Sequence, residues 1–148
     1  MGRNGPARSF MSDKQFFDSN ILVYLQDSAE PQKQQKARSL FAECSRNRSA
    51  VISTQCLQEL YNVTTGKLKQ DKRIIKQVIH NYALYMPVVQ ITPALIEQAI
   101  DISIEVQLSF WDSLILSAAV SAGCTVLYSE DLNDGQIIHG VTVRNPFI

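Results

Sequence analysis

The sequence predicts an α/β domain in which a central parallel sheet lies between layers of helices. Short apolar runs alternate along the chain with longer segments of helical composition, so consecutive strands are joined through helices and are expected to pair in parallel. Apolar residues make up 45% of the 148 residues, which is enough for a hydrophobic core in a chain of ordinary single-domain length. No internal repeat or low-complexity tract interrupts this pattern.

The predicted strands are short and the predicted helices are mostly long. Strands are expected at residues 15–17, 50–52, 88–91, 125–128 and 141–143, the last of them an edge strand. Helices are expected at residues 31–46, 54–66, 71–85, 93–107 and 109–122. A further helix begins at Ile21, after three residues that favour the N-cap position. Helix 109–122 is apolar on nearly every side and is therefore expected to be buried.

Composition narrows the classes of function. Fourteen basic residues balance fourteen acidic ones, which excludes a polycationic nucleic-acid-binding protein but not a local basic patch. No apolar run approaches the roughly 18 residues that cross a bilayer, so no membrane segment is expected. Three scattered cysteines and two histidines form no zinc framework, and the thiols are expected in the core of a reduced, cytoplasmic protein.

The first ten residues contain glycine, proline and arginine but no apolar stretch of the kind found in a secretory signal. We interpret residues 1–10 as a cloning scar or an over-extended start. The single folded domain is accordingly expected to cover residues 11–148.

Four acidic residues occupy positions of chemical interest. Open parallel sheets bind ligands at the carboxyl ends of their strands, and Asp18 and Asp131 each follow such a predicted end. Glu59 and Asp112 instead interrupt the apolar stripes of helices 54–66 and 109–122. A carboxylate on a buried helix face is unfavourable unless another group compensates its charge.

Each acid also has a structural explanation when it is taken alone. Asp18 is placed to cap a helix, and Ser109 with Asp112 fits a capping box. Asp131 lies in a turn sequence, and Glu59 could be a solvated charge on a helix flank. These explanations do not account for all four acids occurring in one chain.

If the four carboxylates meet in one pocket, each pair at 4 Å repels by about 4 kcal/mol at an effective dielectric constant near 20, so the pocket needs protons or cations. A cluster of oxygen ligands favours Mg²⁺ or Mn²⁺. Two such ions would balance four negative charges, as in a two-metal site that hydrolyses phosphodiesters. Ser19, Asn20 and Ser129 would orient the carboxylates or bound water through hydrogen bonds.

Four sequence motifs, taken in order, resemble those of the PIN-domain ribonucleases, and most closely the VapC-type toxins of toxin–antitoxin pairs. They are residues 17–24 (FDSNILVY), the helical Glu59, residues 111–115 (WDSLI) and residues 127–132 (LYSEDL). The resemblance covers about residues 15–148. It implies a PIN-like three-layer α/β/α sandwich, with Asp18, Glu59, Asp112 and Asp131 as the catalytic, metal-binding acids and with Ser19, Asn20 and Ser129 lining the pocket.

The resemblance also implies an activity and partners. The expected protein is a metal-dependent endoribonuclease that hydrolyses RNA phosphodiesters with Mg²⁺ or Mn²⁺, by a two-metal mechanism and without a covalent intermediate. It would form a homodimer, and a cognate antitoxin would inhibit it by occupying the active-site groove. The last motif departs from the common Thr-x-Asp-x-x-Phe, so Glu130 and Asp134 stay open as alternatives to Asp131, which we favour.

RNA binding would also need positive charge near the site. One tract carries five basic residues, and it either contacts RNA phosphates or forms a solvated connection between helices. These residues are Lys67, Lys69, Lys72, Arg73 and Lys76. The aromatic residues Phe16, Phe17, Phe41, Tyr61 and Trp111 lie in apolar contexts, and we interpret them as core residues rather than platforms for base stacking.

Two other functions are compatible with parts of the sequence. A PIN-like module that no longer cleaves RNA would serve as a binding scaffold. A phosphohydrolase of the haloacid-dehalogenase kind would use Asp18 after the first strand, but that family needs Asp-x-Asp and here the second acid is replaced by Asn20.

Overall fold

The computed structural model describes residues 14–148, so the interpretation of residues 1–10 concerns a segment outside the described part. Six strands form one sheet in the order β3-β2-β1-β4-β6-β5. They are β1 (Gln15–Phe17), β2 (Ala50–Ser53), β3 (Val88–Val89), β4 (Val126–Tyr128), β5 (Ile137–Ile138) and β6 (Val141–Arg144). All neighbours pair in parallel except β5 and β6, so the predicted parallel sheet is confirmed.

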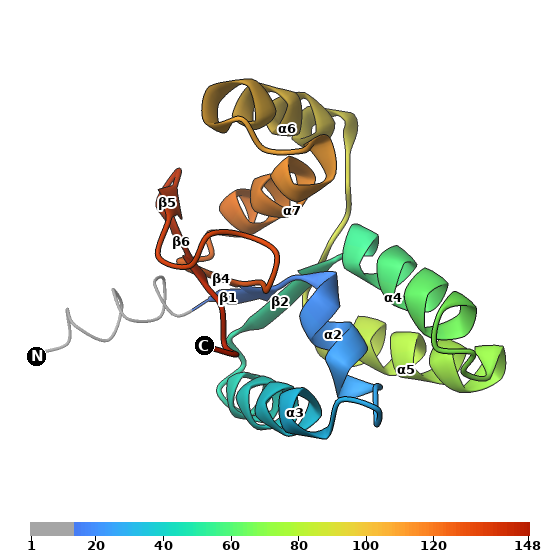
Figure 1. Ribbon diagram of the computed structural model, residues 1–148. Helices are drawn as coiled ribbons and strands as arrows, with labels where there is room; N and C mark the ends of the chain where they lie inside the picture. The colour runs from blue at the N-terminus through green and yellow to red at the C-terminus, as the bar shows by residue number, and fades with distance from the viewer. Residues whose placement is uncertain (1–13) are drawn as a thin grey trace, which may run out of the picture.

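Helices cover both faces of this sheet, which confirms the predicted three-layer α/β/α sandwich. In the described part they are α2 (Ser19–Leu25), α3 (Pro31–Arg46), α4 (Thr54–Gly66), α5 (Lys72–Tyr85), α6 (Pro93–Val106) and α7 (Phe110–Ser121). Figure 1 shows α6 and α7 stacked on one side of the sheet and α2 and α3 on the other, with α4 and α5 packed together beside α2.

The edge of the sheet differs from the prediction. The strand expected at residues 141–143 is β6, which extends to Arg144 and lies between β4 and β5 rather than at the edge. The edge strand on this side of the sheet is β5, which has only two residues, and its Ile137 is exposed. Two residues are too few to show the alternation by which a strand is recognised in a sequence.

The core confirms most of the predicted interior. Phe16 and Phe17 are fully buried, as is most of α7, and the three free cysteines are buried as well. The prediction was wrong for Tyr61, which is 38% exposed, and for Trp111, which is 62% exposed. Within residues 14–148 no helix has both the length and the apolar character to cross a bilayer.

The strand order creates a crevice at the carboxyl ends of β1 and β4. From β1 the chain runs outward to β2 and β3, and then returns to add β4 on the other side of β1. This reversal of strand order is the point where open α/β sheets bind ligands. The backbone N–H of Asp18 donates to Tyr128 O at 3.0 Å, so the two chain segments remain paired just where the strands end.

Candidate active site

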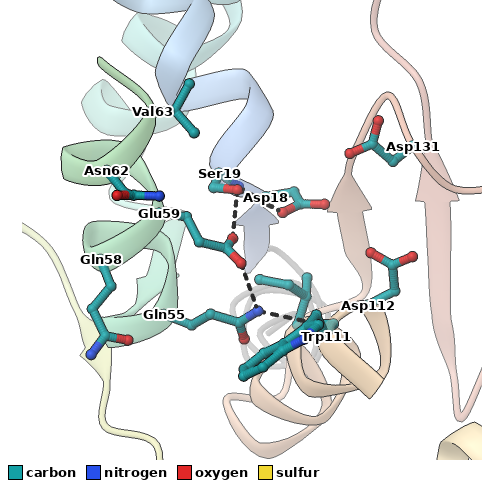
Figure 2. A pocket seen from close by; sticks show the side chains of 11 residues that line it. Asp18, Ser19, Gln55, Gln58, Glu59, Asn62, Val63, Trp111, Asp112 and Asp131 are labelled. Carbon is teal, nitrogen blue, oxygen red and sulfur yellow. Dashed lines mark hydrogen bonds between the residues drawn. The ribbon is translucent and has the colours of Figure 1, made fainter. Parts of the chain in front are cut away.

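The four acids predicted from the sequence line one cavity of about 580 Å³ at this crevice. Asp18 follows β1, Glu59 comes from α4, Asp112 lies in the first turn of α7 and Asp131 follows β4. Figure 2 shows Asp18 between Glu59 on one side and Asp112 and Asp131 on the other. In the described part of the chain, no lysine, arginine or histidine is among the residues that line this cavity.

Asp18 is the most buried of these acids, with 4% of its surface exposed. It is the N-cap of α2, because its Oδ1 accepts a hydrogen bond from the backbone N–H of Ser19 at 2.7 Å. Its Oδ2 accepts a second bond from the hydroxyl of Ser129 at 2.8 Å. The capping explanation is therefore correct, and it is compatible with a place in the cavity.

Burial makes the charge of Asp18 unfavourable. Loss of hydration raises the pKa of this carboxyl from 3.8 to about 7. The bonds from Ser129 and Ser19 lower the pKa, whereas the charges of Glu59 and Asp131 raise it further. Among the described residues Asp18 has no ion-pair partner, so nothing in this part of the chain supplies the missing positive charge.

Glu59 is held by neutral donors from two elements. The hydroxyl of Ser19 donates to its Oε1 at 2.7 Å, and the amide Nε2 of Gln55 donates to its Oε2 at 3.2 Å. The same Gln55 amide donates to the backbone oxygen of Trp111 at 3.1 Å and so links α4 to the start of α7. Gln55 was not predicted as a site residue, although its position four residues before Glu59 places it on the same helix face.

Asp112 lies in the first turn of α7 and is partly buried. Its backbone N–H donates to Oγ of the N-cap residue Ser109 at 3.1 Å, as the capping box predicts. Burial raises the pKa of the Asp112 carboxyl, a hydrogen bond with Ser109 lowers it, and the charges of Asp131 and Glu59 raise it. Ser109 thus caps α7 through the backbone of Asp112, and the Asp112 carboxylate is repelled by the other acids of the cavity.

Asp131 is exposed at the mouth of the cavity, and its orientation is set by Asn20 and Ser129. The amide Nδ2 of Asn20 donates to Asp131 Oδ2 at 3.0 Å, while Oδ1 of Asn20 accepts from the backbone N–H of Glu130 at 3.2 Å. The backbone N–H of Asp131 donates to Ser129 Oγ at 3.2 Å. Of the three polar residues predicted to line the pocket, Ser19 is the one that lines the acidic cavity, and all three form hydrogen bonds with its acids.

The two alternatives to Asp131 have other partners. Glu130 forms an ion pair with Lys33 and accepts a hydrogen bond from the hydroxyl of Tyr24 at 2.6 Å. Asp134 accepts a hydrogen bond from the backbone N–H of Asn145 at 2.8 Å. Neither residue is among those that line the acidic cavity, whereas Asp131 is.

The basic tract lies at the far end of α4 and in the first turns of α5. All five of its basic residues are exposed, which fits a solvated connection between helices. Lys67 differs from the others because it lines a second cavity of about 420 Å³. Ser19, Val63 and Asp131 line this cavity and the acidic one, so the two cavities adjoin.

The donor set of the acidic cavity fits a hard divalent cation. Within residues 14–148, no three acidic, histidine or cysteine side chains lie close enough together to hold one ion among them. Mg²⁺ does not require such a cage, because it retains several water ligands and binds proteins through one or two carboxylates. Carboxylate oxygens line the cavity, and Asp18 is buried near the charges of Glu59 and Asp131 with no ion-pair partner among residues 14–148.

The chain was compared with models of known protein families. The PIN domain family model matches residues 16–133, which is most of the chain and includes all four acids. The chain belongs to the PIN domain family. A search of curated protein sequences finds no match.

Solved structures of PIN-fold toxins share the architecture of this chain. A toxin–antitoxin complex from Klebsiella pneumoniae has 20% identity and a TM-score of 0.69, with 90% of this chain and 98% of that chain covered. VapC20 from Mycobacterium tuberculosis, a toxin that cleaves the sarcin–ricin loop, has 19% identity and a TM-score of 0.64, with 80% and 90% covered. A DNA-bound VapBC from Salmonella typhimurium has 18% identity and a TM-score of 0.65, with 90% and 98% covered.

Proposed function

We propose that this PIN domain is a metal-dependent endoribonuclease and the toxin of a toxin–antitoxin pair. The observation that supports this proposal most strongly is the meeting of four carboxylates from four separate elements, at the strand-end crevice of a PIN fold. Similarity to a toxin that cleaves the sarcin–ricin loop favours RNA as the substrate. A cytoplasmic site of action follows from that substrate.

Asp18, Glu59, Asp112 and Asp131 would hold Mg²⁺ or Mn²⁺. When bound, these ions would lower the pKa of a water molecule and neutralise charge on the scissile phosphate, as in two-metal phosphodiester hydrolysis. The four carboxylates carry the charge that two divalent ions would balance. Retained water ligands would let acids that are too far apart to form one cage act on the same phosphate.

Neutral residues that donate hydrogen bonds to the acids set the positions of the acids. Ser129 donates to Asp18 and Ser19 donates to Glu59, so each carboxylate is held in a fixed orientation. Asn20 holds Asp131 at the mouth. A water molecule then attacks phosphorus in line with the leaving oxygen and a carboxylate accepts the water's proton. The bond from phosphorus to the leaving oxygen breaks, and that oxygen takes up a proton from solvent to leave as a hydroxyl group.

The partners follow from the same proposal. Toxin–antitoxin complexes are among the solved structures that share this fold, and we propose a cognate antitoxin that inhibits the chain by covering the groove. The active form would be a homodimer. The cavity that contains Lys67 would extend this groove from the acids toward the basic tract.

The test is RNA cleavage by the purified protein. The parent should cut RNA with Mg²⁺ or Mn²⁺ and lose activity in EDTA, and Asp112→Asn should be inactive because it removes a carboxylate of the cavity without changing side-chain shape. Asp101→Asn is the matched control, since Asp101 is exposed on α6. If Asp112→Asn cuts as fast as the parent, the proposed site is wrong.

The same test separates the alternatives. A non-catalytic PIN-like scaffold would bind RNA or an antitoxin without cleaving RNA under any metal condition. The haloacid-dehalogenase alternative has lost its support, because the chain belongs to the PIN family and the residue two places after Asp18 is Asn20, whose amide is engaged with Asp131 and Glu130.

A further inference from the structure

We infer that Trp111, together with the cavity beside it, binds an unpaired nucleobase of the RNA substrate next to the acidic cavity. This inference rests on the proposed function and adds a substrate-positioning residue to it. It reverses our interpretation of Trp111 as a core residue.

Trp111 is unusual for a tryptophan in that 62% of its surface is exposed. It lies one residue before Asp112 and lines the acidic cavity. Its ring packs edge to face on Phe110, with 5.0 Å between ring centroids and an interplanar angle of 74°. Phe110 therefore supports the indole from one side while most of the indole stays open to a ligand.

A separate cavity of about 350 Å³ lies beside the indole, within the size range of small-ligand sites. Its walls are mostly apolar, with Phe110, Ile96 and Leu114 among them. Gln55, Gln58 and Trp111 line both this cavity and the acidic one, so the two are neighbours that share a wall. A base bound here would lie next to a phosphate at the carboxylates, and the cavity that contains Lys67 also adjoins the acidic cavity, through Ser19, Val63 and Asp131.

Gln55 supplies an unused polar group at this junction. Its amide nitrogen donates to Glu59 and to the backbone oxygen of Trp111, which both only accept, so the orientation of the amide is fixed. Its Oε1 is buried and has no hydrogen-bond partner among the described residues. An unsatisfied buried acceptor is unfavourable, and an amino group on a base edge would satisfy it once a bound base shifts the surrounding side chains enough to expose this oxygen. Gln58 is exposed in the same wall and adds a second amide.

These features favour a base over an apolar protein segment. The cavity joins a flat aromatic surface to side-chain amides, and this combination stacks and hydrogen-bonds an unpaired base. Figure 2 shows the indole beside Gln55 and close to Asp112, so that a stacked base would adjoin the acids. Stacking of this kind is tolerant of sequence, whereas the amides would favour particular base edges.

Trp111 is the only tryptophan of the chain, so its fluorescence reports on this site alone. The protein would carry Asp112→Asn to prevent cleavage and would be titrated in Mg²⁺ with a random-sequence pool of short single-stranded RNA. Quenching of the fluorescence is expected with this pool. A fully paired duplex and a strand without bases should quench little, although both retain the phosphates. Equal quenching by the strand without bases would overturn the inference.

Cleavage kinetics provide the second measurement. Trp111→Ala should raise KM about 5- to 150-fold with a smaller change in kcat, because base–aromatic stacking contributes about 1–3 kcal/mol per base. Trp111→Phe should recover most of the loss. Tyr85→Ala is the matched control, since Tyr85 is an aromatic residue 80% exposed at the end of α5. Circular dichroism of each variant checks that the fold is intact.

The outcomes separate this inference from the proposed function. If the parent cleaves RNA but Trp111→Ala leaves KM unchanged, the inference fails and the proposed function stands. If the parent never cleaves RNA, the proposed function fails, and base-dependent quenching still decides whether the Trp111 site binds a base. If Trp111→Ala weakens only inhibition by the antitoxin, this surface belongs to the antitoxin and the inference is wrong.

Discussion

Replacement of Asp18 by asparagine should stabilise the metal-free protein at neutral and alkaline pH, although it should abolish cleavage. Asp18 is buried among other acids, and loss of hydration raises its pKa from 3.8 to about 7. Between these two pH values the folded chain binds more protons than the unfolded chain does. The contribution of this group to stability is therefore complete below pH 3.8 and is lost as the pH rises toward 7.

The size of the effect follows from the shift. A rise of about three pKa units corresponds to about 4 kcal/mol, at about 1.4 kcal/mol per unit. Asparagine retains an oxygen that can accept from the Ser19 N–H, but its amide nitrogen cannot accept from the Ser129 hydroxyl. Loss of that bond removes about 1–2 kcal/mol. A net gain of about 2–3 kcal/mol is therefore expected for Asp18→Asn at pH 8.

The assay is chemical denaturation in EDTA from pH 4.5 to 8. The stability difference between Asp18→Asn and the parent should be large at pH 8 and shrink by about 3 kcal/mol toward pH 4.5, where Asp18 is mostly protonated in the folded state. Asp101→Asn, on the exposed face of α6, should follow the parent at every pH. A difference that is independent of pH, or a variant less stable than the parent at pH 8, would refute the reasoning.

Three further predictions concern the metal, the acid at the cavity mouth and the core. Mg²⁺ or Mn²⁺ at 100 times its Kd should raise the free energy of unfolding of the parent by about 2.7 kcal/mol, measured by thermal or chemical denaturation. An equal gain in Asp18→Asn would contradict the proposed metal site. Asn20→Asp should reduce RNA cleavage more than Asn20→Ala does, because it places a carboxylate against Asp131 where an amide now donates a hydrogen bond. Equal cleavage rates of the two variants would contradict the role of Asn20 in holding Asp131. Phe17→Ala should destabilise the fold by about 3–5 kcal/mol in denaturant, since Phe17 is fully buried, whereas Tyr85→Ala should change stability little.

Most of the fold could be predicted because its elements carry strong local signals. Ser53 and Thr92 each cap a helix with a side-chain oxygen, so single residues mark the starts of α4 and α6. The start of α2 was predicted at Ile21 but lies at Ser19, because Asp18 is the one of three candidate residues that caps the helix. The edge of the sheet could not be predicted in the same way. Ile137 and Ile138 become a strand only because β6 is there to pair with them, and that pairing is a property of the folded chain.

The exposure of two aromatic residues was also predicted wrongly. Trp111 follows Phe110 at the start of the largely apolar α7, and Tyr61 follows the buried Leu60, so each has an apolar neighbour in the sequence. Adjacent residues on a helix point about 100° apart, and a buried neighbour therefore says little about the residue beside it. Trp111 and Tyr61 were predicted to be core residues because their neighbours in the sequence are apolar. Whether a helical residue is buried depends instead on the face of the helix on which it lies.

The candidate site could be predicted from the sequence because two of its acids follow predicted strand ends and the other two interrupt apolar stripes of predicted helices. The choice among Glu130, Asp131 and Asp134 needed coordinates. All three lie in one polar turn, and only their partners distinguish them: Lys33 and Tyr24 bind Glu130, and a backbone N–H binds Asp134. Sequence order contains no information about which of these long-range contacts forms.

The partners of the acids explain how the cavity can keep its negative charge. Asp18, Glu59 and Asp131 are each held by a neutral hydroxyl or amide, whereas Glu130, which does not line the cavity, is paired with a lysine. A neutral donor fixes a carboxylate in place and leaves most of its charge uncompensated. A lysine in the same position would also fix the carboxylate, but it would satisfy the charge and leave no electrostatic reason for a divalent ion to bind. The choice of hydroxyls and amides around the cavity is therefore what a cation-binding site requires, and the uncompensated charge of the buried Asp18 makes the metal-free fold less stable.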